Sequence, residues 1–183
     1  MIDASPRAKL LDAAIDHIAH HGGAGRSLRA LAADLGTSHR MLIYHFGSKE
    51  GLLTAVAREV EARQRAALAD LDPAEFWRRL TADDLRANEK LFFQLYGQAL
   101  GGTPGTTEFL DGVIHDWLGP VEALLKERGV PEADRPAHAR LGLAVTRGLL
   151  LDLVTTGDRD AVNAAMEQFL AMYEPHGLTK PEH

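Results

Sequence analysis

SLRALAADLGTSHRMLIYHFGSK, residues 27–49, contains two short amphipathic segments separated by a glycine. In the first segment, apolar residues recur three and four positions apart after Ser27, a favoured N-terminal cap. Gly36 ends this segment, because a residue without a Cβ adopts the left-handed conformation of a helix end at little cost. Ser38 then precedes a second segment in which Leu42 and Phe46 lie four apart and share a face. The spacing predicts two short helices joined by a tight turn.

The apolar faces of these two helices are able to pack together. Leu31 and Ala32 on the first helix can meet Leu42 and Phe46 on the second, provided that a preceding helix crosses both. Such packing would leave four side chains outward: His39, Arg40, Tyr44 and Lys49. These groups are donors and an aromatic hydroxyl, which reach base edges and phosphates. Periodicity alone is equally compatible with two packed helices whose polar face is simply solvated.

Helix signals recur along the rest of the chain. Helix-start residues occur at Ser5-Pro6, Ser48, Asp72-Pro73 and again at Thr81 and Asp84. The GGTPG segment 101–105 is the clearest loop, and we expect Gly119-Pro120 and residues 129–131 to divide the following region into short helices. A long helix is predicted over residues 134–156, and a last helix follows Gly157 and runs through Phe169 to Tyr173. No alternating strand pattern occurs, so the predicted fold is all-α with nine or ten helices.

Composition is that of an ordinary globular protein and excludes several functions. Hydrophobic residues make up 45% and charged residues 25% of the 183 residues. The absence of cysteine excludes disulfides, cysteine-ligated zinc and thiol catalysis. No apolar run approaches the roughly 18 residues of a membrane span, and the N-terminal residues lack an apolar signal core. We therefore expect a cytoplasmic protein that makes no membrane contact.

The charge distribution is uneven along the chain. A net charge of −6 argues at first against a nucleic-acid partner, whose binders carry a basic footprint. However, residues 1–50 balance to +1 and residues 51–183 to −7. Residues 35–49 contain Arg40, Lys49, two histidines and no acid. A local positive face of this kind is what phosphate contact requires.

Patterns for catalysis or metal binding are weak. The neighbours Asp16-His17 and His115-Asp116 would point about 100° apart on a helix, which prevents them from acting together. His17 and His21 have a spacing that can chelate a metal, but no carboxylate completes an HExxH arrangement, so we expect both on a solvated face. No phosphate-binding loop, nucleophile elbow or catalytic acid pair is present. We expect no enzyme activity, no metal and no cofactor.

The N-terminal segment resembles the DNA-binding domain of the TetR family of transcriptional regulators over about residues 7–56. The family pattern is matched by LGTS at 35–38, LIYHF at 42–46 and SKEGLL at 48–53, and the run HFGSKEGLL is highly specific. In the C-terminal part, RGLLLD from residue 147 followed by TGD also looks like the last two helices of the family. The total length of the chain also fits a regulator of this family, and the resemblance implies that the chain adopts the family's fold.

This resemblance implies two domains and a function. A helix-turn-helix DNA-binding domain would occupy residues 1–50, and a helical effector-binding and dimerisation domain residues 51–183. The chain would be a ligand-responsive, sequence-specific regulator: a repressor that binds a palindromic double-stranded DNA operator as a homodimer and is released by a small hydrophobic effector. Effector binding would move the fourth helix, which begins at Lys49, and separate the two recognition helices. The alternative is a non-catalytic helical dimer that binds a small molecule or protein partner without DNA.

The DNA contacts implied by the resemblance are Ser27, Thr37, Ser38, His39, Arg40, Tyr44, His45 and Lys49. The chain departs from the family pattern twice. Ile43 stands where a tyrosine is usual, so one common contact is absent, and Arg40 stands where a small residue is common. An arginine in a major-groove helix can pair with guanine in bidentate fashion. We therefore predict that His39 and Arg40 set the operator preference, whereas Tyr44, His45 and Lys49 hold the DNA backbone.

The family's effector pocket implies a second group of residues. Its candidate lining consists of Phe92, Phe93, Tyr96, Leu100, His115 and Trp117. Few charges fall among these residues, which favours an apolar or aromatic effector with one or two polar groups. An aromatic cluster in an all-α domain is equally typical of a plain core, and that alternative stays open.

The last two helices carry apolar residues on more than one face, which a single buried stripe does not require. The resemblance implies a four-helix dimer interface that includes Leu141, Val145, Gly148, Leu149, Val162, Met166 and Phe169. Gly142 and Gly148 would allow a close approach of the helices. A two-fold dimer suits a palindrome, because two recognition helices about 34–36 Å apart span one turn of DNA.

Overall fold

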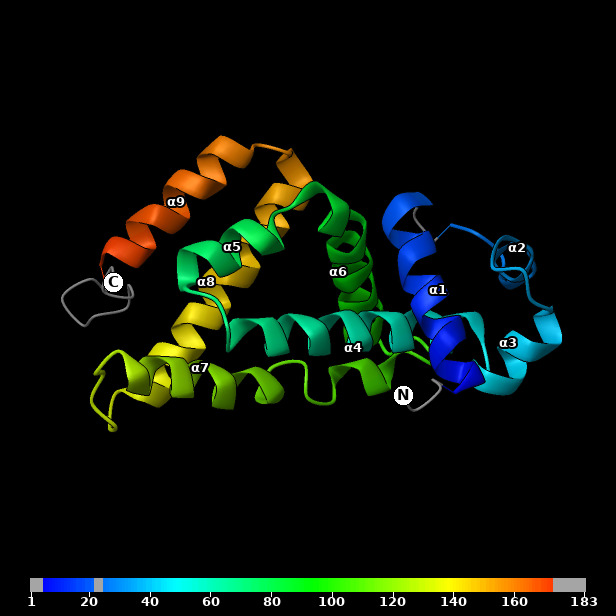
Figure 1. Cartoon of the computed structure of the whole chain (residues 1–183), viewed down its shortest axis with the longest axis horizontal. Coiled ribbons are helices and arrows are strands. Elements are labelled where there is room, and N and C mark those ends of the chain that lie inside the picture. Colours follow the sequence, from blue (N-terminus) through cyan, green and yellow to red (C-terminus); the bar gives the residue numbers. More distant parts are fainter. Residues whose placement is uncertain (1–4, 22–24, 173–183) are drawn as a thin grey trace. The chain divides into compact units, whose positions relative to one another are not determined.

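The computed structural model describes residues 5–21 and 25–172, and over these residues the chain folds into α-helices and two short 3-10 helices without any strand (Figure 1). The elements are α1 (Pro6–His21), α2 (Leu28–Asp34), α3 (His39–Phe46), α4 (Lys49–Leu68), α5 (Pro73–Leu80), η1 (Asp83–Leu85), α6 (Arg86–Leu100), η2 (Thr107–Leu110), α7 (His115–Glu127), α8 (Arg135–Thr156) and α9 (Arg159–Ala171). The all-α prediction is confirmed. The predicted end of the last helix at Tyr173 lies outside the described residues.

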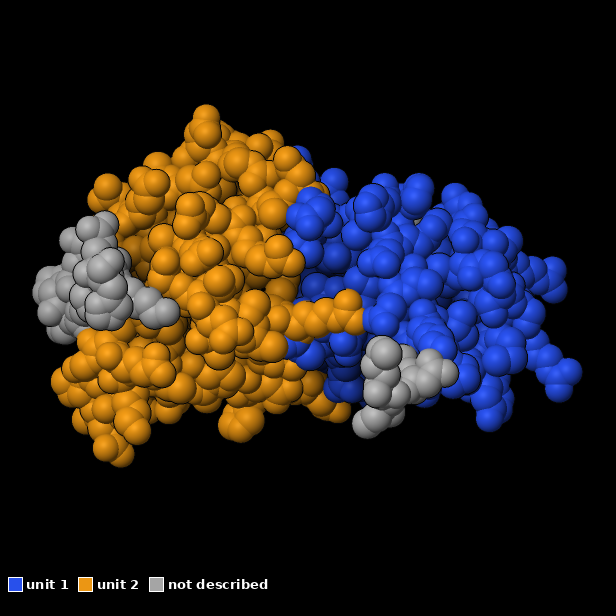
Figure 2. Space-filling view, in the orientation of Figure 1, with its two compact units in different colours: residues 1–62, 84–110 blue, residues 63–83, 111–183 orange. Residues whose placement is uncertain are grey.

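Two compact units make up the chain (Figure 2). The first unit contains the described residues up to 62 together with residues 84–110, and the second contains residues 63–83 and the described residues from 111 onwards. Helix α4 contributes its first fourteen residues to the first unit and its last turns to the second. The functional boundary at residue 50 stays a prediction, because these units describe packing alone.

The first unit is built around helix pairs that bury their apolar faces. Helix α2 packs on α3, α1 packs on α6, and η2 packs on α6. The most deeply buried side chains come from every α-helix in this unit: Ile18, Leu31, Leu42, Leu52, Val56, Leu95 and, from η2, Phe109. Leu31 and Leu42 lie on the packing faces that the sequence predicts for their helices. The core of this unit therefore fixes the positions of α2 and α3.

The second unit is held by packing of α7 on α8, α8 on α9 and α5 on α9. Leu125, Val130 and Ala139 form a buried apolar cluster against which Phe169 of α9 packs. Polar contacts tie α5 to α9 as well, since the Trp77 indole N–H donates to Asn163 Oδ1 at 2.8 Å. These contacts orient α9 against the rest of the unit.

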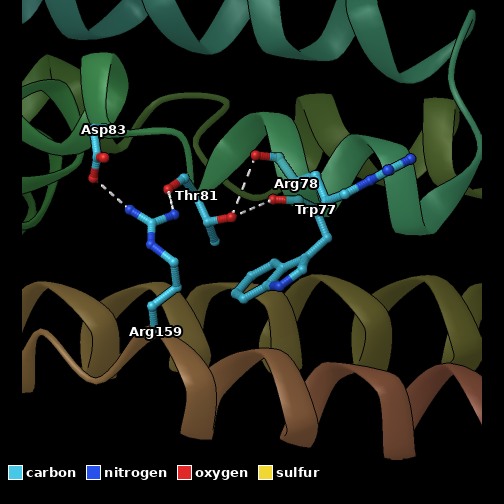
Figure 3. A network of polar contacts seen from close by, with 5 residues as sticks. All are labelled: Trp77, Arg78, Thr81, Asp83 and Arg159. Atoms are coloured by element: carbon cyan, nitrogen blue, oxygen red, sulfur yellow. Dashed lines mark hydrogen bonds and ion pairs between the residues drawn. The ribbon is translucent and has the colours of Figure 1, made fainter.

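A polar network at the end of α5 adds a second connection to α9 (Figure 3). The Arg159 guanidinium donates to the Thr81 carbonyl and pairs with the Asp83 carboxylate. The Thr81 hydroxyl donates to the carbonyls of Trp77 at 3.0 Å and Arg78 at 3.3 Å. Arg159 thus satisfies a backbone carbonyl at a helix end, where no intrahelical donor is present.

One predicted helix boundary is wrong. Gly119-Pro120 does not end a helix, because α7 continues through Pro120 to Glu127. Proline removes one backbone hydrogen bond from the helix interior. Here the helix is held from outside by burial of Trp117 near its start and Leu125 near its end. Tertiary packing therefore outweighs the local preference of proline. Among the described residues, no helix has the length and apolar character needed to cross a membrane.

Candidate nucleic-acid interface

Local hydrogen bonds define the turn between α2 and α3. The Ser27 hydroxyl accepts from the Ala30 N–H at 3.2 Å, and the Ser38 hydroxyl accepts from the Met41 N–H at 3.1 Å. Both serines have extended backbone conformations and cap their helices as predicted. Between them, Gly36 adopts a φ of +63°. The capping side chains and this single glycine set the angle between the two helices.

Helix α3 separates its residues into an inner and an outer face. Leu42 is fully buried and is the residue that anchors α3 in the unit. Arg40 and Tyr44 lie on the opposite side and are exposed, Tyr44 with 78% of its surface, and His39 is exposed at the start of the helix. The eight residues of α3, HRMLIYHF, contain no acid. The outer face is therefore positive to neutral, as contact with phosphate requires.

His45 lies between these two faces and is half-buried. Its ring lies 4.9 Å from the Tyr44 ring and 6.2 Å from the Phe46 ring, measured between centroids. The His45 Nε2 atom is buried and has no hydrogen-bond partner among the described residues. The Arg7 guanidinium covers the Phe46 ring at 5.1 Å. His45 therefore packs with its neighbours, and its predicted contact with the DNA backbone stays a prediction.

The connection from α3 to α4 is unusually tight. Gly47 adopts a φ of +76°, and the Ser48 hydroxyl accepts from the Gly51 N–H at 2.9 Å to cap α4. A Cβ placed on Gly51 would lie 2.1 Å from the Phe46 carbonyl oxygen, a distance that real atoms do not adopt. Lys49 is the first residue of α4 and is half-buried. The glycine at position 51 thus allows the end of α3 to approach α4 closely.

An ion-pair cluster connects α1 to α2. The Arg26 guanidinium lies 2.7 Å from the Asp34 carboxylate, and His17 Nε2 lies 3.4 Å from the same carboxylate. The His17 side chain is largely buried and its ring stacks on His21 at 4.7 Å. The prediction that His17 lies on a solvated face is wrong. Its side chain is covered by Asp34 of another helix, and no local sequence pattern indicates this contact. The Arg26 guanidinium also offsets the charge of Asp34, the acid of α2.

The candidate effector residues on α6 form part of an aromatic cluster. The Phe92 ring contacts Phe93 at 5.2 Å, Tyr96 at 5.8 Å and Phe109 at 5.4 Å, measured between centroids. Phe109 belongs to η2 and is absent from the predicted lining, although it is the first aromatic residue after the glycine-rich loop that follows α6. Leu100, which was also a candidate, is 66% exposed.

The remaining two effector candidates belong to the second unit. Trp117 is buried, 6.2 Å from the Phe76 ring, and the Arg65 guanidinium lies 5.7 Å from its centroid. His115 begins α7 and is exposed. Among the six candidates, ring contacts join Phe92 to Phe93 and Tyr96. The role of all six in effector binding stays a prediction.

Helices α8 and α9 leave an apolar face exposed in the single chain. On α8, Leu141 is 45% exposed, Gly148 is exposed, and Val145 and Leu149 are half-buried. On α9, Val162 and Met166 are buried and Phe169 is half-buried inside the unit, so these side chains fill its own core. The exposed side of α9 carries residues that the sequence prediction did not include: Ala161, Ala164, Ala165 and Gln168. Their three- and four-residue spacing is the signal that would have found them.

Two short helices joined by a glycine turn, with the second capped by serine and basic on its outer face, constitute a helix-turn-helix of the kind that DNA-binding proteins use. Residues 10–56 match the family model described as bacterial regulatory proteins, tetR family. The helix-turn-helix segment of this chain is therefore a DNA-binding domain of the tetR type.

Named relatives and a solved structure are similar to this chain. The chain is 43% identical over 75 residues to the HTH-type transcriptional regulatory protein RaaS of Mycobacterium tuberculosis, a match that covers 39% of this chain and 35% of RaaS. It is 34% identical over 80 residues to the HTH-type transcriptional repressor AcnR of Corynebacterium glutamicum, covering 44% of this chain and 43% of AcnR. The chain thus spans less than half the length of the curated relatives that it matches. The crystal structure of the multidrug binding protein EbrR complexed with proflavin is 27% identical, with a TM-score of 0.57 over 90% of this chain and 99% of EbrR.

Proposed function

We propose that this protein is a non-enzymatic, sequence-specific transcriptional repressor that binds a palindromic operator as a homodimer and is released by a small hydrophobic effector. The observation that carries the proposal is the outer face of α3, which is exposed, free of acids and held in place by a buried Leu42. The similarity to AcnR, a transcriptional repressor, supports repression as the sign of regulation. Such a regulator would act in the cytoplasm, where the bacterial chromosome lies.

In this proposal, the residues of α3 divide between base and backbone contacts. His39 and Arg40 are exposed on the first turn, which is the part of a recognition helix that meets base edges. Phosphate contacts fall to Ser27, Thr37, Ser38, Tyr44, His45 and Lys49. The capping role of the two serines does not prevent this, because a hydroxyl that accepts from a backbone N–H can still donate to a phosphate oxygen.

The exposed apolar face of α8 and α9 supports the homodimer. Leu141, Val145, Gly148 and Leu149 have the spacing of one side of α8, and small alanines occupy the exposed side of α9. Gly142 and Gly148 have no atom within 4 Å of a Cβ built on them, so the backbone of α8 is accessible to a second copy. A two-fold axis through this face would make both copies use the same surface.

The effector proposal rests on the aromatic rings of α6. Phe93 and Tyr96 are half-buried beside the buried rings of Phe92 and Phe109, and ring faces and edges of this kind suit a flat apolar molecule. The multidrug binding protein EbrR was crystallised in complex with proflavin. Helix α4 is the element through which we expect the effector to act, because it is continuous from Lys49, next to α3, to Leu68 in the second unit.

The experiment that tests the proposal is a selection of binding sites from random duplex DNA, followed by titration of the selected duplex at several salt concentrations. We expect a palindrome whose logarithmic affinity falls linearly with the logarithm of the salt concentration, by about 0.9 for each phosphate contacted. Enrichment of no sequence by the full-length chain would contradict the proposal and favour a helical dimer that does not bind DNA.

Arg40→Ala is expected to relax the operator preference at one or two positions and to weaken binding to the selected duplex roughly ten- to a hundredfold. The physical reason is the loss of a bidentate contact to guanine from an exposed side chain of α3. Repeating the selection with the variant measures the preference. Arg29→Ala, which removes the same charge from exposed α2, serves as the control and should leave the preferred sequence unchanged. If Arg40→Ala selects the same sequence as the Arg29→Ala control, Arg40 does not set the operator preference.

Planar aromatic compounds, beginning with proflavin, are expected to bind the protein and to lower its affinity for the selected duplex. Binding is measured first without DNA, by calorimetry and by the tryptophan emission, so that stacking of the dye on bases does not contribute. Tyr96→Ala should weaken this binding because Tyr96 contributes ring contacts to the α6 cluster. If no compound of the panel binds, or if Tyr96→Ala binds equally well, the assignment of the effector to α6 fails.

A further inference from the structure

An isoleucine occupies the outer face of the recognition helix. Ile43 follows His39 by four residues and Arg40 by three, so it lies on the same side of α3 as both. Its side chain is 40% exposed, whereas the neighbouring Leu42 is fully buried. Leu42 thus provides the anchor of α3 in the core, and the apolar surface of Ile43 points outward beside two side chains proposed to read bases.

Exposed apolar side chains are concentrated on this helix. Single exposed apolar residues are ordinary on protein surfaces. Among the described residues, however, seven large hydrophobic side chains are exposed, and three of them, Met41, Ile43 and Tyr44, belong to the eight residues of α3. Helix formation does not explain Ile43 either, because β-branched side chains lose rotamer freedom in a helix. The concentration therefore points to a partner for this face.

The chemistry of the face limits what that partner can be. Arg40 and the absence of acids in α3 make this face complementary to a polyanion, so double-stranded DNA is the partner that fits it. In the major groove, the apolar feature that base pairs present is the C5-methyl group of thymine. An isoleucine three residues after an arginine can therefore recognise a thymine next to the base that the arginine reads.

We propose that Ile43 contacts the thymine C5-methyl group at one position in each operator half-site, adjacent to the base contacted by Arg40. This inference rests on the proposed function, since it requires that α3 enters the major groove. It replaces the polar contact that a tyrosine at this position would make with an apolar one. The operator of this chain would then favour thymine at that position.

The test uses the full-length chain and the duplex recovered by selection from random DNA. Each conserved thymidine is replaced in turn by deoxyuridine, in both half-sites, which removes the methyl group and preserves all base-pairing groups. At one position we expect the affinity to fall about fourfold per half-site, and roughly fifteenfold for both, from the burial of one methyl group. Equilibrium binding of a labelled duplex gives these ratios.

Variants assign the effect to Ile43. In Ile43→Ala, the thymidine and deoxyuridine duplexes should bind equally, because the apolar contact is absent from both, so the two changes are not additive. In Met41→Ala, which shortens another exposed side chain of α3, the deoxyuridine effect should persist. Thermal unfolding verifies that each variant folds, and the partial exposure of both side chains makes a large loss of stability unexpected.

Each contrary outcome has a distinct meaning. A selected operator without a fixed thymine in its half-site, or one in which no deoxyuridine lowers the affinity, would overturn the inference and leave the proposed function intact. A deoxyuridine effect of equal size in Ile43→Ala would overturn it too, because another group would then contact the methyl. Failure to select any sequence would overturn the proposed function and the inference together.

Discussion

Gly51→Ala is expected to abolish specific DNA binding and to destabilise the protein by about 3 kcal/mol, which for a chain of this length corresponds to a fall in Tm of roughly 6–12 °C. The new Cβ would lie 2.1 Å from the carbonyl oxygen of Phe46. Because that atom belongs to the backbone at the end of α3, relief of the clash requires α3 to shift against α4. Thermal unfolding and titration of the selected duplex measure the two effects.

The control for this prediction is another alanine in place of a helical glycine. Gly97 lies in α6, is exposed, and has no atom within 4 Å of the position of a Cβ. Gly97→Ala should therefore stabilise the protein by about 0.5–1 kcal/mol, since alanine is the better helix former. If the Gly51→Ala protein has the same Tm as the Gly97→Ala protein and still binds the duplex, the close approach of α3 and α4 is contradicted.

Most of the helices were predictable because their signals are local. Ser38 and Asp158 cap the helices that follow them, with each side chain accepting from a backbone N–H three residues on. Asp72 does the same before the proline that begins α5. Gly157, at a φ of +77°, ends α8 where expected. Caps and periodicity involve residues within one or two turns, so they can be identified without knowledge of the tertiary structure.

The features that the sequence did not reveal depend on distant contacts. Pro120 lies inside α7 because Trp117 and Leu125 are buried on either side of it. The pairing of His17 with Asp34 joins residues of different helices. The need for glycine at position 51 arises from the angle between α3 and α4, which helical periodicity does not encode. Each of these features is set by packing between elements.

The candidate DNA-binding face was largely predictable from periodicity, because one buried residue every three or four positions defines the opposite side of a helix. His39, Arg40 and Tyr44 are exposed as expected. The apolar faces of α8 and α9 were harder to interpret. Val162 and Met166 fill the core of their own chain, although a sequence with apolar residues on two faces does not tell which face packs within the chain.

Leu141→Glu is expected to convert the dimer into a monomer and to weaken binding to the selected duplex by on the order of a hundredfold. Leu141 is 45% exposed in the single chain, so a carboxylate there leaves the fold of the protomer little changed. In a two-fold interface the substitution acts twice, because the same surface is used by both copies and each carboxylate would be buried against apolar side chains. Loss of one half of the dimer removes the second recognition helix from the palindrome.

Light scattering after size exclusion distinguishes the two states, since the wild type should have twice the 19.9 kDa mass of the chain and the variant that mass once. Ala123→Glu is the matched control, because it adds the same charge at an exposed position of α7 in the same unit. This control should remain dimeric and bind the duplex as the wild type does. A wild-type monomer at micromolar concentration, or a Leu141→Glu protein that stays dimeric, would show that the exposed face of α8 does not hold two copies together. The affinity of Leu141→Glu for a duplex with a single half-site separates dimerisation from DNA contact. An intact α3 should bind one half-site equally well in the monomer and in the dimer.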